Sequence, residues 1–312
     1  MTEAKPSGGS PTAASRTALS ASLMRAAHTR CDSPRLIDDA WGDRLVAAEE
    51  KAGLYRRVLA VATPEARTRL LALGSEQAVL DATLRAHPTY GGVIIRSRYA
   101  EDALAAAVTR GVAQYVLIGA GFDSFSVRQP PWAHGLTIFE VDRPASQAMK
   151  RQRLADCAAQ VPPNVHFVAA DLSAEPLPAA LARSGFSPRR PAFFSWLGVT
   201  IYLTREANLA TLRGVAMAGA PGSELVFTYI DQRILESSAP PMQEMRSARA
   251  ADGEAWISGF DPTSLAAELR SVGLELLEDL SGASLRERYC AERRDGLSPG
   301  IAGHVARARV VS

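Results

Sequence analysis

Short apolar runs alternate with longer helical patterns through most of the chain. The runs are rich in β-branched and aromatic residues, and most end at a glycine or an acidic residue, which is typical of buried parallel strands. Helical patterns such as residues 144–159 fit between them, and the last predicted helix begins at Asp261 and ends at Gly273. This alternation predicts a doubly wound α/β sheet. The runs predicted as strands are residues 115–119, 136–141, 165–170, 192–196, 223–230 and 273–279.

The segment from His304 to Val311 differs from the inner runs, because apolar and polar residues alternate along it. One buried face and one solvated face are typical of an antiparallel strand. We therefore expect a seventh strand, antiparallel to the others, at or near an edge of the sheet.

The residues before the sheet predict an all-helical extension. Apolar residues recur at helical spacing from Ser15, and further helices are predicted over residues 43–61 and 64–85. Another helix is predicted to begin at Arg96 and to end at Gly111, which fits a helix C-terminus. That helix would lead directly into the first strand.

Four parts of the chain follow from these patterns. Residues 1–14 are rich in Pro, Gly, Ser and Ala, which predicts a disordered tail. Residues 15–95 form the helical extension, and residues 96–312 form the sheet domain. Within that domain residues 231–260 fit no strand, and they predict a lid-like insertion above the carboxyl ends of the strands. A mobile surface loop with a short helix is the alternative for the same segment.

Charge and cysteine content narrow the function classes. The 312 residues carry a formal net charge of +2 at pH 7, so we expect neither a nucleic acid nor a membrane surface as partner. Three cysteines far apart in the sequence fit a reducing cytosol, and the five histidines show no metal-ligand spacing. The start of the chain lacks a signal-peptide pattern, and no apolar run is long enough to cross a bilayer. We expect a cytoplasmic protein and assign no metal and no oligomeric state.

A glycine turn after the first predicted strand is the strongest candidate for a ligand site. Gly119 and Gly121 allow a sharp turn and the close approach of a ligand. Asp142 ends the next strand and can accept hydrogen bonds from both hydroxyls of a ribose, and Glu140 competes for that role from the same strand face. The third glycine of a dinucleotide fingerprint is missing, which argues against NAD. The alternatives are an ordinary strand-to-helix turn and a solvated acidic strand end.

Five stretches share their order and spacing with one protein family. They are Arg96–Tyr99, Gln114–Asp123, Phe139–Pro144 with Lys150, Asp171-Leu172 and Leu197–Leu203. Together they resemble the leucine carboxyl methyltransferase family, in its bacterial branch of S-adenosylmethionine-dependent methyltransferases. One departure is Leu197, because the family usually has a glutamate at that position.

The resemblance implies a class I methyltransferase fold, Rossmann-like with seven strands, and S-adenosylmethionine as the cofactor. It also implies that Asp171 accepts a hydrogen bond from the exocyclic amine of adenine, while Leu172 packs on the ring. Considered alone, Asp171 would more often be an N-cap or turn residue.

The methionyl part of this cofactor carries a carboxylate, which an arginine fork can bind in a bidentate manner. In a well-studied branch of the family, an arginine just before the sheet does this. Arg96 is our first choice for the matching position, Arg98 the second and Arg25 a weaker candidate. The alternative for Arg98 is a surface pair with Glu101 or Asp102 along its helix.

We therefore expect a methyltransferase that acts on a hydroxyl or carboxylate of a small molecule. Methylation of a protein C-terminal carboxylate is one alternative, and a non-catalytic S-adenosylmethionine-binding protein, suggested by Leu197, is the other. Methyl transfer requires alignment and exclusion of water, and the sequence shows no nucleophile elbow or paired carboxylates, so we assign no catalytic residue. Four aromatic residues could line an acceptor pocket or serve only in packing: Trp196, Tyr202, Tyr229 and Tyr289.

Overall fold

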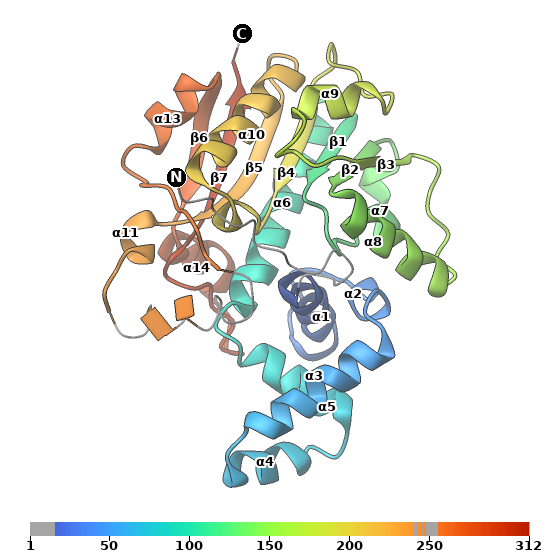
Figure 1. Cartoon of the computed structure of the whole chain (residues 1–312), viewed down its shortest axis with the longest axis vertical. Helices are drawn as coiled ribbons and strands as arrows, with labels where there is room; N and C mark the ends of the chain where they lie inside the picture. Colours follow the sequence, from blue (N-terminus) through green and yellow to red (C-terminus); the bar gives the residue numbers. More distant parts are fainter. Residues whose placement is uncertain (1–15, 240–242, 245, 248–254, 312) are drawn as a thin grey trace, which may run out of the picture.

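The sheet expected from the sequence is present in the computed structural model, which describes residues 16–239, 243–244, 246–247 and 255–311. Seven strands form one sheet in the order β3-β2-β1-β4-β5-β7-β6 (Figure 1). Each predicted strand lies within one residue of its expected bounds. The strands are β1 (Gln114–Ile118), β2 (Thr137–Asp142), β3 (Val165–Ala169), β4 (Ala192–Trp196), β5 (Glu224–Ile230), β6 (Leu274–Leu280) and β7 (Gly303–Val310).

Strand β7 runs antiparallel to both of its neighbours, β5 and β6. It lies one strand from the edge, because β6 forms the edge itself. The prediction of a reversed strand near an edge is confirmed. The carboxyl ends of the other six strands and the start of β7 share one edge of the sheet, which we call the carboxyl edge.

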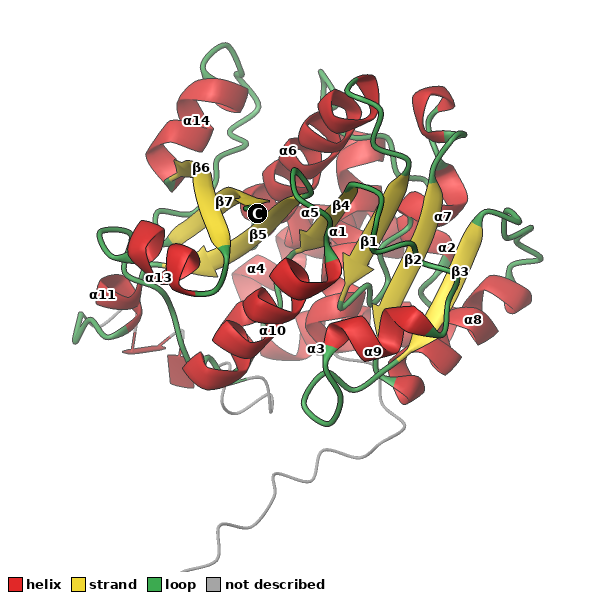
Figure 2. Ribbon diagram, turned by 90° about the horizontal axis from the view of Figure 1, so that it is seen from above, coloured by secondary structure: helices red, strands yellow, loops and turns green. Residues whose placement is uncertain are grey.

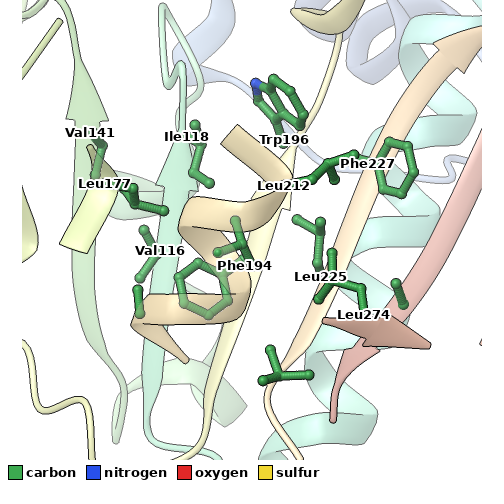
Figure 3. Packing of buried hydrophobic residues seen from close by; sticks show 14 of the residues in the cluster. Val116, Ile118, Val141, Leu177, Phe194, Trp196, Leu212, Leu225, Phe227 and Leu274 are labelled. Atoms are coloured by element: carbon green, nitrogen blue, oxygen red, sulfur yellow. The ribbon is translucent and has the colours of Figure 1, made fainter. Parts of the chain in front are cut away.

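Helices cover both faces of the sheet (Figure 2). Val116 and Ile118 of β1 pack in an apolar cluster with helices α9, α10 and α13 (Figure 3), whereas Tyr115 and Leu117 pack on the other face with α6 and α14. Burial on both faces makes parallel strands continuous apolar runs in the sequence. The helices of this domain are α6 (Tyr90–Thr109), α7 (Phe125–Arg128), α8 (Pro144–Asp156), α9 (Leu177–Ala182), α10 (Arg205–Ala218), α11 (Gln232–Leu235), α13 (Leu265–Ser271) and α14 (Gly282–Cys290), with short 3₁₀ helices η1 (Pro131–Ala133) and η2 (Thr200–Tyr202).

Further helices precede this domain, and α1 lies next to the carboxyl edge (Figure 1). The single helices predicted over residues 43–61 and 64–85 were wrong, because each is divided in two. Gly74 takes a φ of +82° and Ser75 caps a new helix, while the Glu50 carboxylate accepts the N–H of the residue that precedes α3. These helices are α1 (Arg16–Cys31), α2 (Trp41–Arg44), α3 (Ala48–Val61), α4 (Pro64–Leu71) and α5 (Glu76–Arg85).

Helix α6 begins at Tyr90, not at Arg96, so the predicted start was wrong. Gly91 and Gly92 lie inside its first turn. A Cβ on Gly91 would lie 2.0 Å from the carbonyl oxygen of Ser298, so this glycine serves close packing against the C-terminal part of the chain. Arg96 therefore lies within α6, and the predicted boundary between extension and sheet domain falls inside a helix.

The C-terminal helices also differ from the sequence prediction. The helix expected from Asp261 begins at Leu265, and the prediction that it is the last helix was wrong because α14 follows β6. Ser281 caps α14, but Gly282 occupies its first position, where a Cβ would lie 2.2 Å from the carbonyl oxygen of Gly300. A glycine at a helix start obscures the helical pattern.

Only part of the predicted lid at residues 231–260 is described. Helix α11 opens it, and an isolated parallel bridge between Asp231 and Phe260 closes it. The central residues of that segment and the predicted tail, residues 1–14, lie outside the described residues. No helix of the described ranges is long and apolar enough to cross a membrane.

Candidate cofactor site

The turn after β1 requires glycine. Gly119 and Gly121 have φ angles of +67° and +49°, which side chains with a Cβ rarely adopt. The N–H of Gly119 donates to the carbonyl of Val141 at 2.8 Å. A Cβ on Gly119 would lie 2.7 Å from Cγ2 of Val199, in the loop after β4. The turn therefore joins the ends of β1, β2 and β4 at the carboxyl edge.

Asp142 lies directly beside this turn. Its Oδ2 accepts the N–H of Gly121 at 2.6 Å, and its Oδ1 accepts the N–H of Arg143 at 2.7 Å. The residue is half-buried at the strand end. Each carboxylate oxygen can accept a further hydrogen bond, so the group is placed and oriented to receive the hydroxyls of a ligand.

Glu140 lies deeper in the protein than Asp142. It is buried, and its Oε2 accepts a hydrogen bond from Lys150 Nζ of α8 at 2.6 Å. Burial raises the pKa of Glu140 above its ordinary value, although the Lys150 ammonium opposes that shift. Glu140 is thus part of a buried ion pair below the site, and only Asp142 of the two reaches the carboxyl edge.

Arg96 points its guanidinium at the loop after β4. A Cβ on Gly198 would lie 2.7 Å from Nη1 and Nη2, so the glycine makes room for it. Desolvation lowers the pKa of Arg96 to about 10, and the Arg25 guanidinium adds to that shift, whereas Tyr202 and the Asp123 carboxylate oppose it. No hydrogen bond or ion pair joins Arg96 to any residue of the described ranges. A desolvated cation that no carboxylate pairs with directly is costly, so this position suits an anionic ligand.

The two competing arginines have partners already. Arg98 pairs with Asp102 at 2.8 Å and donates to a backbone carbonyl in the N-terminal extension. Arg25 is buried, with Nε 2.7 Å from Asp39 Oδ2 and Nη2 2.6 Å from the carbonyl oxygen of Phe122. Arg25 therefore fixes the glycine turn to α1, and Arg98 lies on the surface as the alternative interpretation stated.

Asp171 and Leu172 follow β3 at the same edge of the sheet. Asp171 is exposed, and its Oδ1 accepts both the N–H of Ser173 at 3.0 Å and its hydroxyl at 2.7 Å. These hydrogen bonds lower the pKa of Asp171 below its ordinary value. Leu172 is half-buried and packs against the apolar cluster of Figure 3. Asp171 and Leu172 are therefore available to a ligand, on the opposite side of Asp142 from Arg96.

The four aromatic candidates separate clearly. Trp196 and Tyr229 are buried in the apolar cluster, and Tyr289 donates to Asp102. Tyr202 alone lies near Arg96, and its hydroxyl is 3.4 Å from the Thr17 hydroxyl of α1. The first turn of α1 thus lies over the site, where a Cβ on Gly121 would be 3.6 Å from that of Ala18.

Sequence reasoning missed three contributors to this site. Gly198 lies in the Leu197–Leu203 stretch, directly after a predicted strand, and a glycine at that position was a usable signal of a site. No sequence pattern marked Asp39, which pairs with Arg25, or Thr17, because both act through contacts with residues distant in the sequence. Leu197 packs its side chain against the apolar cluster under α6, so the position that is usually a glutamate provides no carboxylate for Arg96.

A 3-2-1-4-5-7-6 sheet with a reversed β7, a glycine turn after β1 and an acid at the end of β2 defines a class I S-adenosylmethionine-dependent methyltransferase. The residues fit this cofactor, since no carboxylate of the described residues forms an ion pair with Arg96 and Asp142 retains free acceptor capacity. The chain belongs to the leucine carboxyl methyltransferase family, whose model matches residues 18–216.

Relatives and a solved structure agree with this assignment. The chain is 31% identical over 289 residues to the "Putative S-adenosyl-L-methionine-dependent methyltransferase YktD" of Bacillus subtilis, which covers 91% of this chain and 94% of the relative. A relative of the same description from Mycolicibacterium smegmatis is 34% identical over 228 residues, covering 73% and 71%. These matches confirm the predicted family, enzyme class and cofactor.

The fold has a solved counterpart in a crystal structure of a "putative methyltransferase" from Thermobifida fusca YX. The TM-score is 0.54 at 20% sequence identity, and the match covers 76% of this chain and 88% of the other. The similarity confirms the predicted class I methyltransferase architecture.

Proposed function

We propose that this enzyme transfers the methyl group of S-adenosylmethionine to an oxygen atom, a hydroxyl or a carboxylate, of a small molecule. In this proposal Arg96 binds the methionyl carboxylate, the backbone of Gly119 and Gly121 contacts the cofactor, and Asp142 binds the ribose. Asp171 and Leu172 hold the adenine, as the family resemblance implies.

The observation that carries the choice of a small acceptor is that two distant segments converge on the carboxyl edge. The first turn of α1 lies over the glycine turn and contacts Tyr202. From the other side, the N–H of Ile257 donates to the carbonyl of Ile201 at 2.7 Å, and the N–H of Phe260 donates to that of Ile230 at 3.1 Å. Segments that cover the edge from two sides would exclude water from the transfer and would favour a small acceptor over an extended protein tail.

Labelled cofactor tests the proposal. The protein is incubated with methyl-labelled S-adenosylmethionine and a bacterial extract that has been separated into small molecules and macromolecules. Label in the small-molecule fraction supports the proposal. Label only in protein, released by mild alkali as methanol, would instead indicate carboxyl methylation of a protein, as the family name suggests. No transfer, with S-adenosylhomocysteine still bound in calorimetry, would indicate a non-catalytic binding protein.

A further inference from the structure

A polar cluster lies at the carboxyl edge outside the cofactor site, where β5, β7 and β6 meet. Tyr229 donates its hydroxyl hydrogen to Asp279 Oδ2 at 2.7 Å. His304 Nδ1 lies 3.1 Å from Asp279 Oδ1 and 3.1 Å from the Tyr229 hydroxyl. The His304 ring also stacks on the Tyr229 ring, with centroids 4.8 Å apart. One residue from each of three strands thus forms a single network.

The geometry fixes how His304 carries its proton. A carboxylate at Nδ1 holds the hydrogen on that nitrogen, and this leaves the lone pair on Nε2. Nε2 makes no hydrogen bond with any residue in the described part of the chain. His304 is 9% exposed, and its Nδ1 contacts hold the ring in place. This is the arrangement of a histidine oriented by a carboxylate to accept a proton.

A β-bulge in β6 creates the cluster. The register shifts between Leu276 and Glu278, after which Asp279 pairs with Ala306. Without the shift Asp279 would pair with Val305 and point to the opposite face, because neighbouring residues of a strand alternate between faces. With it, Asp279 shares a face with His304 and Tyr229. Bulges that redirect one side chain are frequent beside active sites.

The cluster lies within reach of an acceptor held beside the cofactor site. Strand β7 is two positions from β4, whose end carries Gly198 and the Arg96 guanidinium. At about 4.8 Å between neighbouring strands, this separation is roughly 10 Å, the length of a one- or two-ring molecule. The Phe260 ring packs on the Tyr229 ring with centroids 5.7 Å apart, so the end of the 231–260 segment lies beside the cluster.

We propose that His304 is the catalytic general base and that the acceptor group is a hydroxyl. The inference rests on the proposed function and narrows its acceptor from two oxygen types to one. The hydroxyl proton moves to Nε2 of His304 as the oxygen bonds to the methyl carbon. The carbon–sulfur bond breaks, its electron pair remains on sulfur, and the imidazolium later releases the proton to solvent. Asp279 is a positioning residue that orients the ring through Nδ1.

Charged groups from neighbouring elements lie around the His304 ring. Asp279 faces it from β6, and Asp231 acts on it from the end of β5. Arg233 of α11 pairs with Asp231 at 2.7 Å and offsets part of that charge. A carboxylate acceptor would have no proton to lose at neutral pH, so a base at this position has a use only for a hydroxyl.

The test uses the full-length enzyme and the labelled small-molecule product from the extract. We expect the product to resist mild alkali, because methyl ethers survive conditions that hydrolyse methyl esters. We expect H304N to lose about 10²- to 10⁴-fold in kcat and to lose the rise of rate with pH through the histidine range. D279N should shift that pH profile with a smaller loss, and both variants should bind S-adenosylhomocysteine like the wild type.

The matched control is H166N, since His166 is a ring-stacked histidine on β3 away from the cluster. It should leave the rate and the pH profile unchanged. An alkali-labile product would overturn the proposal that His304 is the general base, while leaving the proposed function intact. An alkali-stable product formed by H304N at the wild-type rate would also overturn it. Absence of any labelled product would overturn both proposals together.

Discussion

Side chains of one chemical type at the carboxyl edge differ in what the fold leaves them free to bind. Three arginines were candidates for the cofactor carboxylate, and two of them pair with Asp39 and Asp102. Two acids competed for the ribose, and one is buried against Lys150. A site residue here is distinguished by an unfilled hydrogen-bonding capacity, since a group that is already paired gains little from a ligand.

Arg96→Lys should weaken S-adenosylhomocysteine binding by tenfold or more, about 1.4 kcal/mol, because lysine cannot supply the planar fork that a carboxylate accepts. Adenosine lacks the carboxylate and should bind both proteins equally. Calorimetry with the two ligands makes the measurement. Arg98→Lys is the matched control on the same helix, and a selective loss in that variant instead would show that the order of the two arginines is reversed.

Asp142→Ala should weaken S-adenosylhomocysteine binding by about ten- to a hundredfold, since a lost charge-assisted hydrogen bond costs roughly 1.5–3 kcal/mol. Asp38→Ala removes an exposed carboxylate and serves as the control. Thermal unfolding separates binding from folding, because Asp142 also holds Gly121. Unchanged affinity in a folded Asp142→Ala protein would assign the ribose to another group.

At the scale of elements, loops after different strands are held together by contacts that leave no room for a Cβ. The turn after β1 meets Val199 of the loop after β4, and Gly198 of that loop meets Arg96. The first turns of α6 and α14 meet the C-terminal loop through Gly91 and Gly282. These glycines are therefore required by close packing between elements as well as by local turn geometry.

Gly119→Ala should lower both the thermal unfolding midpoint and cofactor affinity. The alanine would have to adopt the left-handed backbone conformation of Gly119, which costs about 1–2 kcal/mol, and its Cβ would clash with Val199. Gly111→Ala is the control, because that glycine has a φ of +93° but open space around it. Both variants carry the backbone strain, so a larger loss at Gly119 measures the contact. Equal losses would contradict it.

For the whole molecule, buried acids fasten the N-terminal extension to the sheet domain. Asp39 binds Arg25 and lies near Arg128 of α7, and Asp32 accepts hydrogen bonds from Tyr90 of α6 and from Arg85. Burial alone would raise the pKa values of both acids, but these partners, together with the hydrogen bond between His28 and Asp32, outweigh it and hold them below the ordinary value.

A carboxyl group whose pKa is lower in the folded than in the unfolded state stabilises the fold at pH values above its unfolded-state pKa. That stability is lost as the pH falls through the folded-state pKa. Asp39→Asn should therefore lower the free energy of unfolding at pH 7. The difference in the free energy of unfolding between the variant and the wild type should shrink as the pH falls below 3.8, the ordinary pKa of an aspartate. Denaturant unfolding at pH 7, 5 and 3 measures this, and a constant difference across that range would contradict it.

The sequence by itself determined the strands, the glycine turn and the family, because these depend on local periodicity and on motifs that stay contiguous. It misplaced helix boundaries at Gly74 and Gly91 and missed the helix that begins at Gly282. Glycine either ends a helix or allows close contact at these positions, and the pattern of one sequence does not distinguish the two. It also supplied candidates for the cofactor site, but left the choice between neighbouring residues open.

Only the tertiary structure decided which of those neighbours is available. Asp142 and Glu140 share a strand face, and burial against Lys150 separates them. His304 joins Asp279 and Tyr229 only because a bulge shifts β6 by one residue. Each of these outcomes depends on a partner from a distant part of the chain, and the desolvation and pairing that such a partner brings have no counterpart in local sequence.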